Sequence, residues 1–390
     1  MPVEQQQQGR RGIREHVLGN GLCTGCSACV NLCPYLTHYR DHTVMVHTCD
    51  LQDGRCQAYC PRTMTDLGSL RRTLFDPKDL TLELGAFRGL YLTRSTDGSV
   101  RAGAQHGGTV STLMMLALSE GIIDTAVVAY AKEDLLTEGI AVQDSRGIIA
   151  SSKSKFVVSP TIGKFNEAAR GSSKRIGLVA TPCQALALAK MRVNAVAEDE
   201  HIIQKLHLVI GLFCGWALSW EGLKTLISRK FGDTPIQKLD IPPSRHQCME
   251  LTTAGGTIEI PLEDVEGLVR ESCRYCFDMT CEFSDISVGS ARSEKGWKVD
   301  KGWNQVIVRT KLGDQLINTA RSKGMLEFRD VPEANLDKLK RAALNKKRTC
   351  LRNLVEKSGS PHDLLYLDDQ DPAVSQWKEK VTDWGSGIRG

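Results

Sequence analysis

Four cysteines near the N-terminus constrain this chain more than any other feature. Cys23, Cys26, Cys29 and Cys33 follow the pattern C-x2-C-x2-C-x3-C, and a proline comes directly after the last of them. This spacing is typical of a loop that wraps thiolates around an iron–sulfur cluster, and a disulfide-linked knot is the weaker interpretation. We therefore expect electrons to pass through this protein.

A second group of cysteines repeats the end of that pattern. Cys49, Cys56 and Cys60 finish in C-x3-C-P. In a ferredoxin with two related halves, the three clustered cysteines of one half share a cluster with the Cys-Pro cysteine of the other half. This rule predicts one [4Fe-4S] cluster on Cys23, Cys26, Cys29 and Cys60, and a second on Cys33, Cys49 and Cys56. The second set is one thiolate short, which leaves alternatives open: a fourth ligand from His47, Asp50, Asp53 or hydroxide, a three-iron cluster, or spare buried thiols at Cys49 and Cys56.

Length and composition indicate a globular protein of two or three domains. The chain has 390 residues, is 41% hydrophobic and 25% charged, and carries a net charge of +4, which is too weak to indicate nucleic-acid binding. The longest apolar run, residues 206–218, is too short to span a bilayer, and the polar N-terminus lacks an apolar signal core. Cysteines at metal-ligand spacing without a signal predict a reducing cytoplasm, with any membrane association through partner proteins.

The pattern along the chain predicts four regions. We expect a polar arm over residues 1–20, a ferredoxin-like module over 21–78 that needs metal to fold, a large domain over 79–330, and a helical extension over 331–390. Within the large domain, strands and helices alternate, which predicts an α/β (α+β) core. The expected strands are residues 90–93, 125–131, 175–180, 206–213, 287–289 and 305–309, and the expected helices are 109–120, 184–191 and 219–231.

Two cysteines of the large domain stand where predicted buried strands end. Cys183 follows the strand 175–180, and Cys214 follows the strand 206–213. If these strands are parallel neighbours, their carboxyl ends meet at one edge of the sheet, where active sites of α/β proteins gather. Cys273 and Cys276 add a C-x2-C pair and complete a four-thiolate set. Zinc binding, redox chemistry and simple burial of Cys183 remain alternatives, and Cys281 is a rival ligand.

Two further segments are candidates for binding a nucleotide. Gly107 and Gly108 precede the predicted helix 109–120, where exposed amides and the helix dipole favour a phosphate, although ordinary turn glycines are the stronger interpretation of the pair. The second segment, residues 153–156, is a basic loop, for which solvated surface charge is the alternative.

Several of these segments together resemble a known family. They are residues 106–111, 154–156, 180–184, 211–214, 273–278, 285–289 and 302–310. Their order and content resemble the family of coenzyme F420 hydrogenase/dehydrogenase beta subunits over roughly residues 21–325. The resemblance implies one FAD per chain and a [4Fe-4S] cluster on Cys183, Cys214, Cys273 and Cys276. It also implies a flavin site formed by His106, Gly107, Gly108, Thr109, Ser111, Lys153, Ser154, Lys155, Phe156, Thr181, Pro182 and Gln184.

The resemblance further implies an oxidoreductase subunit in which the flavin, and no protein side chain, performs the chemistry. Electrons would pass between coenzyme F420 or a similar hydride carrier and two or three clusters that lead to a partner such as a hydrogenase, formate dehydrogenase or other reductase. The alternatives are a ferredoxin-dependent reductase of an organic substrate and a non-catalytic electron-transfer subunit. Candidate cations for an anionic cofactor tail are Lys153, Lys155, Arg270, Arg274, Arg292 and Lys295.

Overall fold

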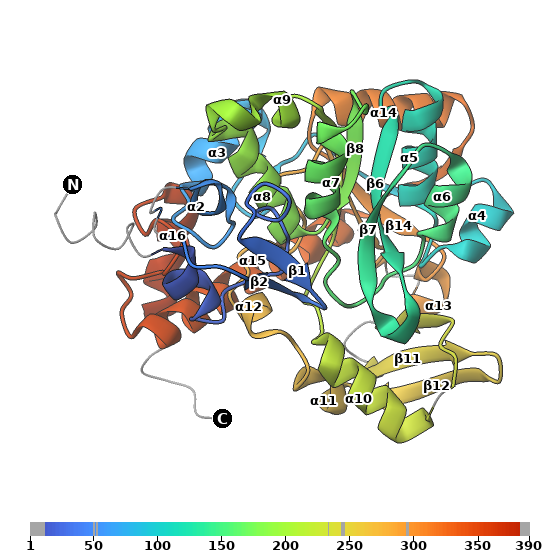
Figure 1. Cartoon of the computed structure of the whole chain (residues 1–390). Coiled ribbons are helices and arrows are strands. Elements are labelled where there is room, and N and C mark those ends of the chain that lie inside the picture. Colours follow the sequence, from blue (N-terminus) through green and yellow to red (C-terminus); the bar gives the residue numbers. More distant parts are fainter. Residues whose placement is uncertain are drawn as a thin grey trace.

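An eight-stranded mixed sheet forms the centre of the protein (Figure 1). The computed structural model describes residues 12–49, 51, 54–232, 234–242, 246–293 and 296–382. The strand order is β15-β5-β14-β13-β9-β8-β6-β7, and the four strands from β13 to β6 are parallel, whereas the others join the sheet antiparallel. The strands are β5 (Gly89–Ser95), β6 (Thr125–Ala131), β7 (Thr137–Val142), β8 (Ile176–Ala180), β9 (Leu206–Leu212), β13 (Ile286–Ser290), β14 (Asn304–Val308) and β15 (Leu326–Arg329).

Helices cover both faces of this sheet. Because successive side chains of a strand point to opposite faces, Leu208 and Ile210 of β9 pack on one side and Val209 on the other. The first side carries α5 (Thr109–Ser119), α14 (Lys311–Ser322), α6 (Ser145–Ala150) and α4 (Gly98–Gly103), and the second carries α7 (Thr161–Arg170), α8 (Pro182–Val193) and α9 (Glu200–Ile203). The predicted mixed α/β fold is thus confirmed.

A smaller unit with its own apolar core lies below the sheet in Figure 1. It combines a three-stranded antiparallel sheet with two helices: β10 (Lys238–Asp240), β11 (Cys248–Thr253), β12 (Gly256–Pro261), α10 (Trp220–Phe231) and α11 (Leu262–Glu266). Leu223 of α10 and Leu251 of β11 are completely buried in this core. The sequence analysis predicted α10 but no separate unit around it.

The N-terminal module packs into the main core. It contains a helical turn (Arg14–Leu18), the hairpin β1 (Leu36–Tyr39) and β2 (His42–Met45), and the helices α2 (Arg55–Tyr59) and α3 (Leu67–Leu74). Val17 and Tyr59 are buried in the same apolar cluster as Phe165 of α7. The polar arm expected over residues 1–20 therefore differs from the structure after residue 12, since Ile13 and Val17 are core residues. The two-stranded β3 (Leu80–Thr81) and β4 (Gly85–Ala86) follow.

The C-terminal extension closes over the N-terminal module. It consists of α15 (Glu333–Ser358) and α16 (Pro372–Thr382), and the short α12 (Glu271–Arg274) and α13 (Trp297–Asp300) precede it in the chain. The Thr65 amide donates to the Tyr366 carbonyl at 2.8 Å, and Leu67 and Leu367 lie in one apolar cluster. Figure 1 shows the two ends of the described chain, blue and red, on the same side of the molecule. Segments that are distant in the sequence therefore form one packed body.

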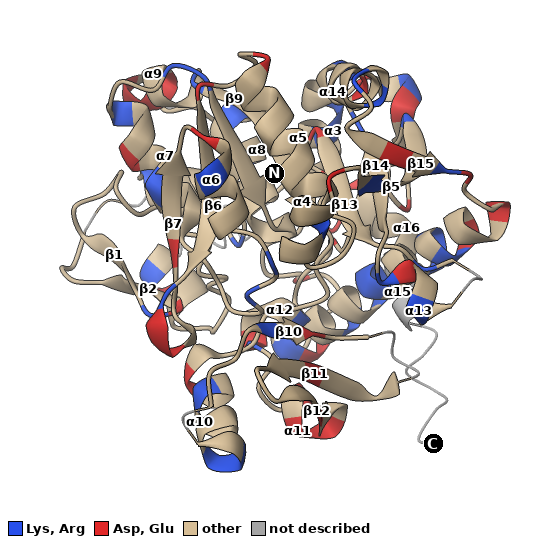
Figure 2. Ribbon diagram, turned by 90° about the vertical axis from the view of Figure 1, so that its right-hand side faces the viewer, with Lys and Arg blue, Asp and Glu red and all other residues tan. Residues whose placement is uncertain are grey.

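The surface carries charges of both signs. Figure 2 shows basic and acidic residues interspersed over helices in both halves of the molecule, in keeping with the small net charge. Across the described ranges, no helix combines the length and the apolar character that crossing a membrane requires.

Candidate functional site

The carboxyl ends of β6, β8 and β9 open into a cavity of about 340 Å³. Cys183 and Cys214 lie at this edge because β8 and β9 are parallel neighbours, as the sequence predicted. Most segments that the sequence analysis marked as cofactor-binding line this one cavity. They are His106, Gly108, Thr109, Ser111, Lys153, Ser154, Lys155, Phe156, Thr181, Pro182 and Gln184.

Gly107 and Gly108 form a tight turn into α5. Gly108 has a φ of +79°, which favours glycine. A Cβ atom on Gly107 would lie 2.8 Å from Asn304 Oδ1 and 3.0 Å from the Thr93 carbonyl oxygen, so a side chain does not fit there. Gly107 itself packs against β5 and β14, whereas Gly108 and Thr109 face the cavity. The N-terminus of an eleven-residue helix thus points its positive dipole end at this space.

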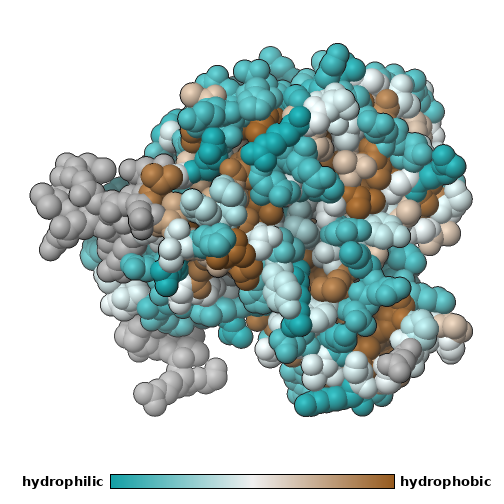
Figure 3. All heavy atoms as spheres, in the orientation of Figure 1, coloured by the Kyte–Doolittle hydropathy of each residue, from teal (hydrophilic) through white to brown (hydrophobic). Residues whose placement is uncertain are grey.

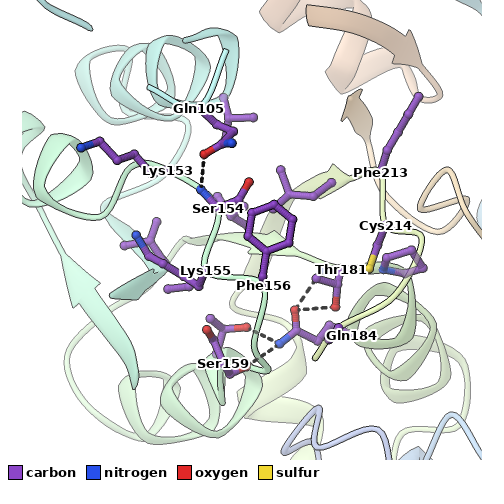
Figure 4. A pocket seen from close by; sticks show the side chains of 18 of the residues that line it. Gln105, Lys153, Ser154, Lys155, Phe156, Ser159, Thr181, Gln184, Phe213 and Cys214 are labelled. Carbon is purple, nitrogen blue, oxygen red and sulfur yellow. Dashed lines mark hydrogen bonds between the residues drawn. The ribbon is translucent and has the colours of Figure 1, made fainter. Parts of the chain in front are cut away.

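The basic loop after α6 brings two lysines to the cavity (Figure 4). The Ser154 amide donates to Gln105 Oε1 at 3.1 Å, which ties this loop to the segment before the glycine turn. Burial, with the charge of Lys153 as a smaller cause, lowers the pKa of Lys155 to about 8. Both ammonium groups donate to backbone carbonyls, and neither pairs with a carboxylate in the described part of the chain. The cavity therefore has positive charge that no carboxylate of the described residues neutralises.

Gln184 organises the turn after β8 (Figure 4). Its Oε1 accepts from the Thr181 amide at 2.9 Å, and its Nε2 donates to the Ser159 carbonyl and to Thr161 Oγ1, both at 2.8 Å. Gln184 is 4% exposed, and its polar atoms are engaged within the protein. Its direct contact is therefore with neighbouring segments, and it positions Thr181 at the cavity wall.

His106 directly precedes the glycine turn. Burial lowers its pKa to about 4, so the imidazole is neutral at pH 7. Its Nδ1 lies 3.3 Å from the Lys301 carbonyl oxygen, and its ring meets Trp297 edge-on at 5.6 Å between centroids. His106 thus contributes shape to the cavity and no positive charge.

Four cysteines of the large domain line the same cavity. Cys183 lies in the first turn of α8, Cys214 follows β9, Cys273 lies in α12, and Cys276 follows that helix. Burial raises the pKa of Cys214 well above its ordinary value, and the other three thiols raise it further because they are close by. The Ala217 amide donates to Cys273 Sγ at 3.3 Å, a contact that favours a thiolate at this position.

The thiols of the N-terminal module lie close enough to influence one another. Burial raises the pKa of Cys29 well above its ordinary value, and Cys26, Cys60, Cys23 and, as the smallest cause, Cys56 add to this effect. Burial also raises the pKa of Cys56, with Cys33 and Cys49 as its thiol neighbours. This grouping is compatible with the predicted ligand sets, and the ligation itself stays a prediction.

Cys26 joins the two regions. It lines the main cavity, and Cys183 is among the neighbours that raise its pKa after burial and Cys60. Cys26 therefore lies between the large-domain set and the thiols of the N-terminal module.

None of these sets has the geometry of a single-ion site. Among the described residues, no three His, Cys, Asp or Glu side chains converge as ligands of one metal ion. A tetrahedral zinc site requires thiolate sulfurs about 3.8 Å apart, as follows from a Zn–S bond of about 2.3 Å. An iron–sulfur cluster is larger than one ion and holds its thiolates farther apart.

The remaining cysteines and histidine candidates are separate from these sets. Cys281 Sγ donates to the Ala180 carbonyl at 3.5 Å and packs against Gly211, so this rival ligand is a core residue behind the strands. Cys350 is buried beside Tyr366. His47 is exposed and contacts Tyr35, while Asp50 and Asp53 lie outside the described residues.

Some cations expected at the cofactor serve elsewhere. Arg270 is 8% exposed, pairs with Asp41 at 2.7 Å and donates to the Cys23 carbonyl, so it fastens the N-terminal module to the large domain. Arg274 is exposed, and its carbonyl accepts from Asn353 of α15. The Arg292 guanidinium lies over Trp297 at 4.8 Å, and Lys295 falls outside the described residues. Lys153 and Lys155 are the two members of the predicted set that reach the cavity wall.

The sequence analysis missed several residues of the site. Arg62, Trp216 and Asn304 line the cavity, and Lys190 of α8 approaches the loop after Cys60 from within the core. Asn304 belongs to one of the family-like segments. Arg62 and Lys190 follow no spacing rule, because their positions depend on how the N-terminal module docks.

Comparison with known proteins places these features in a family. The family described as "Coenzyme F420 hydrogenase/dehydrogenase, beta subunit" matches with its N-terminal part over residues 90–164 and its C-terminal part over residues 173–334. The coenzyme F420 hydrogenase subunit beta of Methanothermobacter thermautotrophicus is 29% identical over 278 residues, which cover 70% of this chain and 95% of that protein. One component of the F(420)H(2) dehydrogenase of Methanosarcina mazei is 25% identical over 319 residues, which cover 73% of this chain and 85% of that protein.

A solved structure agrees with these sequence matches. A chain of the F420-reducing [NiFe] hydrogenase complex from Methanosarcina barkeri superposes with a TM-score of 0.64 and 25% sequence identity, covering 72% of this chain and 94% of that chain. The fold matches that of a chain in an oxidoreductase complex, and the two relatives are themselves subunits of oxidoreductases. The chain belongs to the family of coenzyme F420 hydrogenase/dehydrogenase beta subunits, as the resemblance predicted. The N-terminal module and most of α15 lie outside the residues that the family match covers.

Proposed function

We propose that this chain is an iron–sulfur flavoprotein subunit that passes electrons between a hydride carrier and a partner redox subunit. The carrier would be coenzyme F420 or a similar compound, as the names of the relatives suggest. The observation that carries the proposal is that one cavity unites a helix N-terminus, two lysines without carboxylate partners among the described residues and the cysteines of two thiol sets. FAD bound there would supply the hydride chemistry and release single electrons to the clusters.

The residues present fit a flavin dinucleotide. A pyrophosphate is anionic and needs cations and exposed amides, which Lys153, Lys155 and the N-terminus of α5 offer. The flavin ring needs an apolar wall, which Phe156, Val128 and Leu212 supply. The chain's own role is to bind the cofactor, to hold it beside the Cys183 edge and to exclude water from that edge.

The cysteine sets fit an electron path away from the cavity. The large-domain set borders the cavity, the set of Cys26 and Cys60 comes next, and the set of Cys33 and Cys56 lies toward the β1–β2 hairpin. In this proposal residues 21–78 act as a ferredoxin-like module, residues 79–330 hold FAD and one cluster, and residues 331–390 brace the junction.

The outer hairpin is suited to a protein partner. Tyr35, Tyr39 and Val46 are exposed beside the irregular thiol set, and Figure 3 shows apolar atoms gathered over this part of the surface. A hydrogenase, formate dehydrogenase or other reductase component docked here would bring its redox centre close to the last cluster. No nucleic acid is required by any feature of the site.

The test uses holoprotein purified without oxygen. With an artificial acceptor present, it should oxidise reduced F420, seen as the return of the absorbance of oxidised F420. Failure of this reaction in protein that retains flavin and clusters would refute the F420 assignment, and reduction of an organic substrate by reduced ferredoxin would then support the alternative enzyme. Absence of flavin from holoprotein with intact clusters would instead support a non-catalytic electron-transfer subunit.

A further inference from the structure

A buried arginine lies at the junction of two thiol sets without a carboxylate partner among the described residues. Arg62 follows Cys60 and Pro61 and is 2% exposed. It lines the main cavity together with Cys26, Cys183 and Cys276. It also lines the smaller adjoining pocket, again beside Cys183 and Cys276. The side chain thus stands between the N-terminal module and the large domain.

Arg62 forms no ion pair with a described carboxylate, although Asp278 and Glu282 also line the smaller pocket, where Glu282 is paired with Arg71 and Lys347. Its Nη2 donates to the Ser272 carbonyl at 3.2 Å, and its guanidinium lies over the Tyr366 ring at 4.4 Å from the centroid. Its Nε is buried without a hydrogen-bond partner in the described part of the chain. A carbonyl and an aromatic face stabilise a cation only in part, and a fully buried charge without a counter-charge is strongly unfavourable.

An iron–sulfur cluster would supply the negative charge that Arg62 lacks as a partner. A [4Fe-4S] core held by four thiolates is negatively charged when oxidised and gains a further negative charge on reduction. Cys183 and Cys276 line both cavities together with Arg62, and both would be ligands of the large-domain cluster. A fixed cation beside them stabilises the reduced form more than the oxidised form and therefore raises the reduction potential.

We propose that Arg62 is the counter-charge of the cluster on Cys183, Cys214, Cys273 and Cys276 and sets its reduction potential. This inference rests on the proposed function, since it requires the clusters. The step it controls is the uptake of one electron by the cluster. Arg62 is a positioning residue in this proposal, because it acts through the charge of the cluster.

Lys190 provides an internal comparison. It is 3% exposed and also lacks a carboxylate partner within the described ranges, but its ammonium donates to oxygen atoms of the 60–65 loop, with the Cys60 carbonyl at 2.8 Å. Its nearest thiol is Cys60, which belongs to the other cluster set. The charge of Arg62 also reaches Cys60, but less strongly than that of Lys190, so loss of Lys190 should act chiefly on the cluster that Cys60 would ligate and loss of Arg62 chiefly on the cluster of Cys183 and Cys276.

The experiment is a potentiometric titration of holoprotein followed by electron paramagnetic resonance. In Arg62→Met, one cluster signal should need a more negative potential. At the wild-type midpoint its reduced-to-oxidised ratio should fall at least tenfold, which is a shift of about 59 mV for a one-electron couple. Arg62→Lys keeps the charge and should restore most of that ratio. Lys190→Met should move another signal.

Several outcomes separate this inference from the proposed function. Three outcomes would each overturn the role of Arg62 alone. The first is unchanged potentials in Arg62→Met with full iron content, and the second is equal shifts in Arg62→Met and Arg62→Lys. The third is one shared signal that both Arg62→Met and Lys190→Met move. If wild-type protein purified without oxygen contained no iron, the proposed function would be overturned as well. If Arg62→Met yields no folded holoprotein, the comparison of Arg62→Gln with Arg62→Lys decides by the same criteria.

Discussion

Replacing Glu282 with glutamine should destabilise the junction of three distant segments. Its carboxylate lies 3% exposed between Arg71 of α3 and Lys347 of α15, whose side chains are 6% and 1% exposed. Glu282 itself follows the Cys276 loop of the large domain. Removing this charge leaves two buried cations without their partner, which typically costs about 3–5 kcal/mol.

The pKa of Glu282 gives an independent magnitude for this stabilisation. Burial alone would raise it, but Arg71 and Lys347 together lower it to about 2 from an ordinary 4.5. This shift corresponds to about 3 kcal/mol. Because the pKa of the folded state is depressed, this stability is fully present above pH 4.5 and is lost as the pH falls from 4.5 toward 2. At pH 7 the wild-type protein therefore holds all of it.

The assay is thermal unfolding of the holoprotein at pH 7 and a fixed scan rate. A chain of 390 residues has an unfolding entropy of about 0.8 kcal/mol/K, so a loss of about 3–5 kcal/mol lowers Tm by about 4–6 °C. Glu271→Gln is the matched control, because Glu271 also pairs with a lysine of α15, Lys357 at 2.8 Å, but is 53% exposed. That exposed pair should contribute under about 1 kcal/mol.

Two results would refute this reasoning. One is an equal change in Tm for Glu282→Gln and Glu271→Gln, and the other is no change for Glu282→Gln. Adding Lys347→Met to Glu282→Gln should recover part of the loss, because it removes one of the stranded cations.

Three further predictions concern the cofactors. Gly107→Ala should lower the amount of flavin bound per chain and reduce the free energy of unfolding by about 1–3 kcal/mol, since its Cβ would lie 2.8 Å from Asn304 Oδ1. Gly302→Ala, whose Cβ would have its nearest contact at 4.0 Å, should bind flavin normally. Lys155→Met should weaken flavin retention by about tenfold, because one charge-assisted contact is lost. Lys164→Met is the control, since it removes only an exposed pair with Glu167 and should retain flavin normally. Equal retention in the two variants would argue against a pyrophosphate near Lys155. Cys56→Ser should lower iron content by about one cluster, while Cys281→Ala should leave iron content unchanged, and the reverse result would reassign the ligands.

The local pattern of the sequence was enough to predict the central elements. The strand expected at 125–131 coincides with β6, and the helix expected at 109–120 differs from α5 by one residue. The placement of Cys183 and Cys214 at one edge also followed from the sequence, because buried apolar runs that alternate with helices form parallel strands with their carboxyl ends together.

Other features depend on contacts between residues far apart in the chain. The small unit around β10–β12 was not predicted, because the alternating runs at residues 249–252 and 257–260 are only four residues long and do not indicate which core they join. The N-terminal arm was expected to be polar, yet Ile13 and Val17 are buried in the apolar cluster that also contains residues of α7 and α8. Likewise, a helical extension was predicted over 331–390, but its role as a brace through Lys347 and Glu282 was not.

The chemical character of this protein is thus encoded locally: which cysteines occur at ligand spacing, which turn admits a phosphate, and which strands carry them. Spacing is a local property, so these predictions needed no knowledge of distant contacts. How the cysteine sets lie relative to one another, and which charges stand between them, depends on the packing of the whole chain. Arg62 acquires its place beside Cys183 because the N-terminal module, the sheet edge and Tyr366 of the C-terminal extension enclose it, and no local pattern records such a meeting.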